Sequence, residues 1–161
     1  MSSSDGEGID EPHHRECSAP LGASCLQQGM LYLHAAAPQQ RTFVESVTWA
    51  LDGPLDASRF RRAWEAVVAA TPMLRTRFAP NATPQPLQVV EATAALPFAV
   101  ADHSGCEGAA ARAAAVDAAV RRERAAGIDL EAAPLLRLRL LRFDPTSHAL
   151  VLTIHHLVED G

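Results

Sequence analysis

The chain has 161 residues, enough for one domain with a substantial core, and its 48% share of hydrophobic residues is that of a globular protein. Its formal net charge of −5 argues against a nucleic-acid-binding protein, because there is no basic stripe to neutralise phosphates. No apolar run approaches membrane-spanning length, and the N-terminus has neither the basic start nor the apolar core of a signal peptide. We therefore expect a cytoplasmic protein with neither a nucleic acid nor a membrane as partner.

The N-terminal part of the chain divides into a polar segment and a first helix. Residues 1–20 are polar and contain glycine and serine, so we expect a disordered segment there, followed by one domain over residues 21–161. Ser24 and Gln27 have the spacing of a helix capping box. The apolar residues that follow at helical spacing are Leu26, Met30 and Leu33.

A strand, a helix and three short extended pieces are predicted next. Residues 42–51 alternate as in a strand, with one face formed by Phe43, Val47, Trp49 and Leu51. Asp56 is a candidate N-cap for an amphipathic helix that Pro72 ends, with an apolar face of Phe60, Ala63, Trp64, Val67 and Val68. Extended pieces are predicted over residues 74–78, 87–90 and 98–101.

The last third of the sequence predicts a helix and a β-hairpin. The helix covers residues 108–126 and is stopped by Gly127. The hairpin strands cover residues 135–143 and 148–156, joined across the turn at 144–147. In the first strand leucines alternate with Arg137 and Arg139, which predicts one solvated face. The second strand is apolar on both faces, which predicts a central position in the sheet.

The chain ends on a tight polar motif, H-H-x-x-x-D-G, formed by His155, His156, Asp160 and Gly161 directly after the apolar strand. Successive side chains on a strand point to opposite faces, so one histidine belongs to a site and the other packs behind it. This argues against a metal site, since both imidazoles would have to converge, with Asp160 and His148 as the only nearby ligands. Taken alone, the motif also fits two half-buried histidines before an Asp-Gly turn.

Four segments in order resemble the condensation-domain family of nonribosomal peptide synthetases. Residues 129–137, D-L-E-A-A-P-L-L-R, lead through the hairpin into the histidine motif as in that family. Residues 24–32 resemble its first motif, and residues 51–56 together with 74–78 resemble its second region. That region usually reads R-H-x-x-L-R-T-x-F, whereas this chain has Ala70 and Thr71 in place of the arginine and histidine.

The resemblance implies an α/β fold (an α+β two-layer sandwich) in which helices pack on a mixed sheet. Condensation domains consist of two lobes similar to chloramphenicol acetyltransferase, with the histidine motif at the floor of a tunnel between them. The chain corresponds to most of the N-terminal lobe, truncated at the motif. We therefore expect an inactive fragment when this lobe is isolated.

The resemblance also implies amide formation in secondary-metabolite biosynthesis. A carrier-bound acyl or peptidyl thioester would react with the amine of a carrier-bound aminoacyl group. No cofactor or metal would be bound directly, since the 4'-phosphopantetheine arms belong to partner carrier proteins. An adenylation domain in the same assembly line would be a further partner.

Individual roles follow from the same resemblance. His156 would be the catalytic base, or the group that orients the amine, and its imidazole would be largely neutral at cellular pH. His155 would be structural, Asp160 would pair with Arg75, and the Gly161 amide would lie near the developing oxyanion.

Two other functions are compatible with the sequence. The first is another acyltransferase with the same motif, which uses coenzyme A or a carrier-bound donor. The second is a non-catalytic half-domain that docks a carrier protein.

Overall fold

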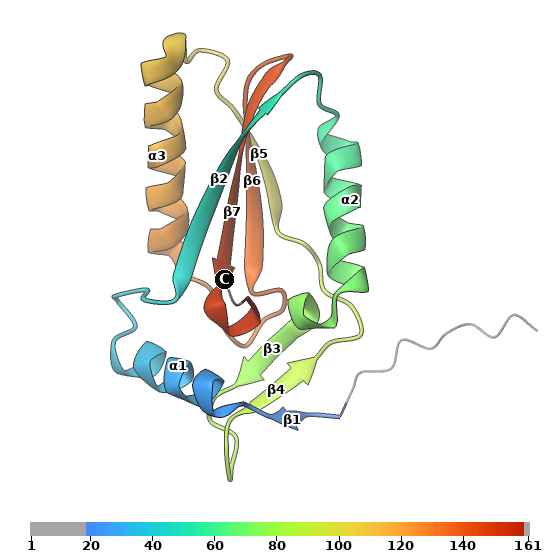
Figure 1. Ribbon diagram of the computed structural model, residues 1–161, viewed down its shortest axis with the longest axis vertical. Coiled ribbons are helices and arrows are strands. Elements are labelled where there is room, and N and C mark those ends of the chain that lie inside the picture. The colour runs from blue at the N-terminus through green and yellow to red at the C-terminus, as the bar shows by residue number, and fades with distance from the viewer. Residues whose placement is uncertain (1–18, 160–161) are drawn as a thin grey trace, which may run out of the picture.

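The computed structural model describes residues 19–159 and contains two β-sheets with three α-helices (Figure 1). The elements in chain order are β1 (Leu21–Gly22), α1 (Cys25–Ala36), β2 (Val44–Asp52), α2 (Ala57–Ala70), η1 (Pro72–Arg75), β3 (Thr76–Ala79), β4 (Leu87–Val90), β5 (Phe98–Asp102), α3 (Gly108–Ala126), β6 (Leu136–Asp144), β7 (Ser147–His155) and η2 (His156–Val158). The segment predicted to be disordered, apart from residues 19 and 20, lies outside the described residues.

The larger sheet is mixed, with the order β2-β7-β6-β5. β7 pairs with β2 and β6 in antiparallel fashion, whereas β5 and β6 run parallel. β7 therefore has a strand on each side, and this confirms the central position predicted from its apolar faces. The smaller sheet has the order β1-β4-β3 and lies beside α1 at one end of the larger sheet (Figure 1).

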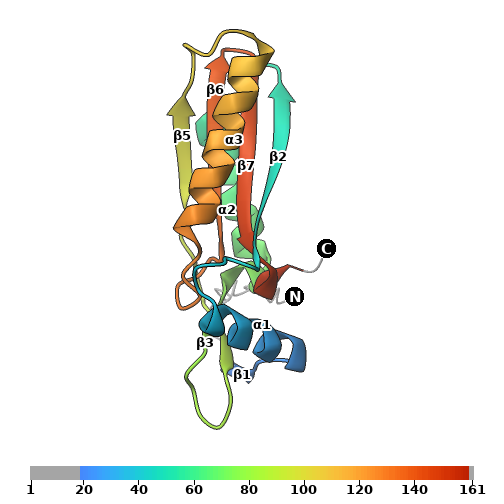
Figure 2. The ribbon, with the colours of Figure 1, turned by 90° about the vertical axis from the view of Figure 1, so that its left-hand side faces the viewer.

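Helices lie on both faces of the larger sheet, rather than on one (Figure 2). Leucines of β6 and β7 pack with Val68 of α2 in the larger hydrophobic cluster. Leu141 and Val151, which point to the opposite face, pack with Ala119 of α3. Within residues 19–159 no helix combines the length and the apolar character needed to cross a bilayer.

The helix boundaries follow from local sequence signals, namely a capping residue at the start of α2 and a glycine after α3. Asp56 caps α2 by accepting hydrogen bonds from the backbone N–H groups of Ser58 and Arg59. α3 covers the predicted residues, and Gly127 follows it with a φ of 66°. The predicted hairpin is confirmed, with its strands at Leu136–Asp144 and Ser147–His155.

The prediction of a solvated face on β6 is wrong. Arg137 and Arg139 lie under α3, where both guanidinium groups reach the carboxylate of Glu123, whose side chain is only 5% exposed. Glu123 and Ala119 are the two buried residues of α3. Charge pairing across the layers therefore replaces solvent on this face of the strand.

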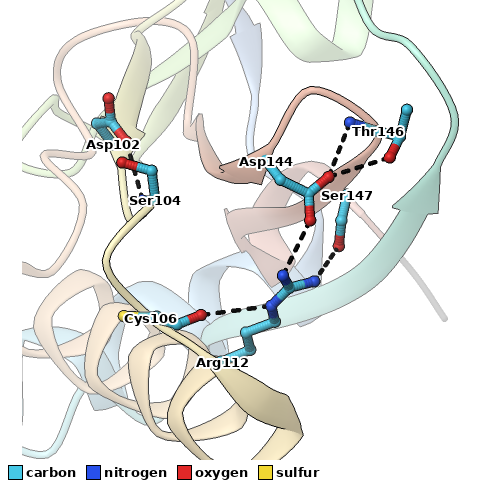
Figure 3. A network of polar contacts seen from close by, with 7 residues as sticks. All are labelled: Asp102, Ser104, Cys106, Arg112, Asp144, Thr146 and Ser147. Atoms are coloured by element: carbon cyan, nitrogen blue, oxygen red, sulfur yellow. Dashed lines mark hydrogen bonds and ion pairs between the residues drawn. The ribbon is translucent and has the colours of Figure 1, made fainter.

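A second polar cluster fastens the hairpin turn to the start of α3 (Figure 3). Arg112 donates hydrogen bonds to Asp144 at 2.9 Å, to Ser147 at 2.8 Å and to the carbonyl oxygen of Cys106 at 3.4 Å. Asp144 also accepts from the backbone and hydroxyl of Thr146. This end of the sheet is opposite to the end at which the histidines lie (Figures 1 and 2).

Candidate active site

The two histidines of the terminal motif lie in different environments at the end of the central strand. His155 is the last residue of β7 and has no exposed surface, whereas His156 begins η2 and its side chain is 26% exposed. The strand periodicity that separates them in the sequence thus separates them in space. Asp160 and Gly161 lie outside the described residues.

His155 has the surroundings of a structural residue. Its Nδ1 accepts a hydrogen bond from the backbone N–H of Leu157 at 3.1 Å, so the neutral ring carries its hydrogen on Nε2. Nε2 is buried without a hydrogen-bond partner among residues 19–159. The ring centroid lies 5.5 Å from that of His34 and 6.1 Å from that of Phe43. Burial, aided by His34 and His156, lowers the pKa of His155 to about 4, so this ring is neutral at neutral pH.

His156 lies between two carboxylates. Its Nε2 is 3.0 Å from Oε1 of Glu45, and its Nδ1 is 3.2 Å from Oε2 of Glu159. The hydrogen bond that Glu45 accepts from His156, with smaller contributions from Glu159, raises the pKa of His156 above its usual value. The charged imidazolium is therefore favoured here, which differs from the neutral ring expected from an unperturbed pKa.

Backbone pairing fixes His156 relative to β2. In the sheet register Val44 faces His155 and Glu45 faces Ile154. The backbone N–H of His156 continues this pairing by donating to the carbonyl oxygen of Phe43 at 3.0 Å. Glu45 therefore reaches His156 from a strand that is paired over nine residues.

A pocket of about 420 Å³ opens beside His156. It is lined by residues of α1, η1 and η2, namely Ser24, Leu26, Gln27, Met30, Met73, His156, Leu157, Val158 and Glu159. The capping box of Ser24 and Gln27 is confirmed, and the Gln27 side-chain amide also donates to the carbonyl oxygen of Leu157 at 3.4 Å. The two capping residues thus join the start of the domain to the histidine motif.

The apolar face predicted for α1 is wrong in part. Leu26 is 69% exposed and Leu33 is 52% exposed, whereas Leu31 is the residue that α1 buries. Leu26 instead contributes to the pocket wall, together with Met73 of η1. Sequence reasoning missed Leu26, Met73, Glu45 and Glu159 as site residues. The one available signal was that Glu159 lies within the motif, directly before Asp160.

Arg75 binds backbone carbonyl groups among the described residues, and its predicted partner Asp160 lies outside them. Its Nη1 donates to the carbonyl oxygens of Glu91 and Ala92, which ties η1 to the segment after β4. Its Nε is buried without a hydrogen-bond partner among residues 19–159. Arg75 does not line the pocket beside His156.

Comparison with solved structures places this fold in a defined class. The starter condensation domain of rhizomide synthetase RzmA superposes with a TM-score of 0.78 at 22% identity, over 89% of this chain and 34% of that one. The first condensation domain of the calcium-dependent antibiotic synthetase gives a TM-score of 0.76 at 22% identity, over 86% of this chain and 33% of that one. The fold is therefore that of part of a condensation domain.

The sequence comparisons agree with the structural ones. A family model described as Condensation domain matches residues 20–161, and the chain belongs to this family. Chondramide synthase cmdD of Chondromyces crocatus is 39% identical over 122 residues, which are 76% of this chain and 3% of that protein. The nonribosomal peptide synthetase gloA of Glarea lozoyensis is 34% identical over 137 residues, 84% of this chain and 2% of that protein. The chain thus spans a small part of these relatives.

Proposed function

We propose that this chain is part of a nonribosomal peptide synthetase condensation domain that joins an acyl or peptidyl thioester to an aminoacyl amine. Both substrates would arrive on the 4'-phosphopantetheine arms of carrier proteins, with an adenylation domain in the same assembly line. The observation that carries the proposal is the partly exposed imidazole of His156 beside a pocket at the end of the central strand. The match of residues 20–161 to the Condensation domain family supports it.

The reaction requires the domain to position the two substrates and to transfer a proton from the amine to the departing thiol. The amine nitrogen bonds to the thioester carbonyl carbon, the carbon–sulfur bond breaks, and the amine proton ends on the departing thiol. Thioesters react readily with amines, so holding two tethered groups end to end supplies much of the acceleration. His156 would orient the amine and accept its proton as the new bond forms.

The remaining motif residues would support this centre. Asp160 would pair with Arg75, and the backbone N–H of Gly161 would lie near the oxyanion that develops on the thioester carbonyl. His155 would brace the turn into η2 through its hydrogen bond from Leu157.

Replacing each histidine separately tests the proposal in the complete condensation domain. We expect His156→Ala to reduce amide formation by about 100-fold or more, the usual scale of a lost general base, while loading of the carrier proteins is unchanged. We expect His155→Ala to lower the melting temperature, because it removes a fully buried side chain and the hydrogen bond to Leu157. Product formation from preloaded carriers and thermal unfolding are the two measurements.

A His156→Ala domain that forms amide at the wild-type rate would overturn the catalytic role of His156. Equal losses of activity at unchanged melting temperature in both variants would show that the two faces of β7 do not separate the roles. Circular dichroism of both variants identifies any loss of activity that comes from misfolding.

A further inference from the structure

The two carboxylates beside His156 are held by different kinds of structural element. Glu45 is located on β2, whose backbone is paired with β7 from Val44 to Asp52. Glu159 follows a single 3₁₀ turn and lines the pocket, whereas Glu45 is not among the residues of the pocket wall. One partner of His156 is therefore held by the sheet, and the other borders the space that a substrate can enter.

The surroundings of His156 favour a form of its ring that cannot act as a base. Each ring nitrogen faces a carboxylate oxygen, at 3.0 Å for Nε2 and 3.2 Å for Nδ1, and this arrangement favours the doubly protonated ring. A doubly protonated imidazole has no lone pair in the ring plane with which to accept a proton. One carboxylate has to release the ring nitrogen that it contacts before that nitrogen can accept a proton from an amine.

Position decides which carboxylate leaves. An acceptor in the pocket does not meet Glu45, because Glu45 lies outside the pocket wall. Glu159 can turn toward the pocket, where an acceptor in its ammonium form offers three N–H donors to a carboxylate. We infer that Glu45 is a positioning residue that holds Nε2 of His156, and that Glu159 is the exchangeable partner that gives up Nδ1 to the acceptor amine.

The proposed sequence of events balances its protons. The entering ammonium pairs with Glu159, and the Nδ1 proton and the extra ammonium proton leave to solvent. As the amine nitrogen bonds to the carbonyl carbon, Nδ1 accepts one proton from it. Nδ1 then returns that proton to the sulfur as the carbon–sulfur bond breaks. Throughout, Nε2 keeps its hydrogen and donates it to the Glu45 carboxylate, which fixes the tautomer and the orientation of the ring.

This inference rests on the proposed function, and its test uses the same complete domain with preloaded carriers. We expect Glu45→Ala to lower kcat by about tenfold to 100-fold through lost orientation, with little change in KM for the aminoacyl carrier. Glu45→Gln keeps an oxygen that can accept from Nε2–H, so it should restore most of kcat. The acidic limb of its kcat profile should lie at lower pH, because a carboxylate that favours imidazolium has been removed.

Glu159→Gln should act differently. Its main effect should be a several-fold increase in KM for the aminoacyl carrier, because the ammonium loses its partner, while kcat is retained. Glu131→Gln is the matched control, since it removes one exposed carboxylate on the turn after α3 without touching the site.

The outcomes separate this inference from the proposed function. If His156→Ala is inactive while both Glu45 variants keep the wild-type kcat, KM and pH profile, Glu45 has no positioning role. If Glu159→Gln lowers kcat and leaves KM unchanged, the assignment of the exchangeable partner is wrong. If His156→Ala is active, the proposed function itself fails. Melting temperatures that match the wild type exclude a folding defect as the cause.

Discussion

Adjacent residues of one motif show how strongly local surroundings set the chemistry of a side chain. His155 and His156 have the same imidazole, yet burial lowers the pKa of the first and two carboxylates raise the pKa of the second. Desolvation penalises the charged ring in the first case, whereas ion pairing favours it in the second. At neutral pH the buried ring is therefore neutral and the exposed ring is biased toward its charged form.

The low pKa of His155 predicts acid sensitivity of the fold. The folded-state pKa of about 4 lies below the ordinary value of 6.5, so the unfolded chain binds more protons between these two values. The contribution of His155 to stability is complete above pH 6.5 and is lost as the pH falls toward 4. His34 has a pKa lowered by burial and by Arg41, so it acts in the same direction, and His156 acts in the opposite direction.

We expect the melting temperature of the complete domain to fall as the pH is lowered from 6.5 to 4. In His155→Asn an amide oxygen can accept the Leu157 N–H without titrating, and its dependence on pH should be weaker. Thermal unfolding of both proteins across this range is the measurement. Parallel curves would show that groups other than His155 dominate.

At the scale of single elements, the most accurate sequence predictions rest on strong local signals. α3 has the predicted bounds because Gly127 follows it with a positive φ, and the apolar character of β7 on both faces indicated its central position. The failure on β6 has the opposite cause. Alternating arginines resemble a solvated face, and no local pattern shows that Glu123, 14 and 16 residues earlier, neutralises them.

The cluster of Glu123, Arg137 and Arg139 should contribute strongly to stability. Burial alone would raise the pKa of Glu123, but hydrogen bonds from Arg139 and Arg137 bring it below its usual value. Glu123→Ala would leave two arginines under α3 without their acid. We expect it to lower the free energy of unfolding by about 3 kcal/mol, the lower end for a broken buried pair, because both arginines keep some contact with solvent.

Urea denaturation measures this loss, and the exposed pair of Arg61 and Glu65 on α2 supplies the control. Glu65→Ala removes an i,i+4 partner at the surface and should cost less than about 1 kcal/mol. Similar losses in the two variants would mean that the cluster under α3 is no more important than a surface ion pair.

At the scale of the whole molecule, the pocket beside His156 joins distant parts of the chain. Ser24 is the N-cap of α1 and Leu26 lies on α1, whereas Met73 comes from η1 and Glu159 follows η2. The side of the pocket formed by the histidine motif could be recognised in the sequence because the residues of the motif are contiguous. It could not predict the opposite wall, since that wall depends on how α1 and the smaller sheet pack against the end of the larger one.

The sheet register makes the two histidines sensitive to the number of residues in β7, and an odd change differs from an even one. Each residue added to or removed from β7 moves the later residues by about 3.3 Å and turns them to the other face. Removing Thr153 would place His156 in the buried position of His155 and Leu157 in the position of His156. We expect this deletion to abolish amide formation and to lower the melting temperature.

An inserted glycine between Pro145 and Thr146 is the matched control, since the turn can absorb it before the paired residues begin. If the deletion and the insertion reduce activity equally, chain length alone is responsible. If only the deletion is inactive, the alternation of side chains along β7 determines which of the two histidines is buried. A histidine is buried or partly exposed according to whether an odd or an even number of residues separates it from the turn.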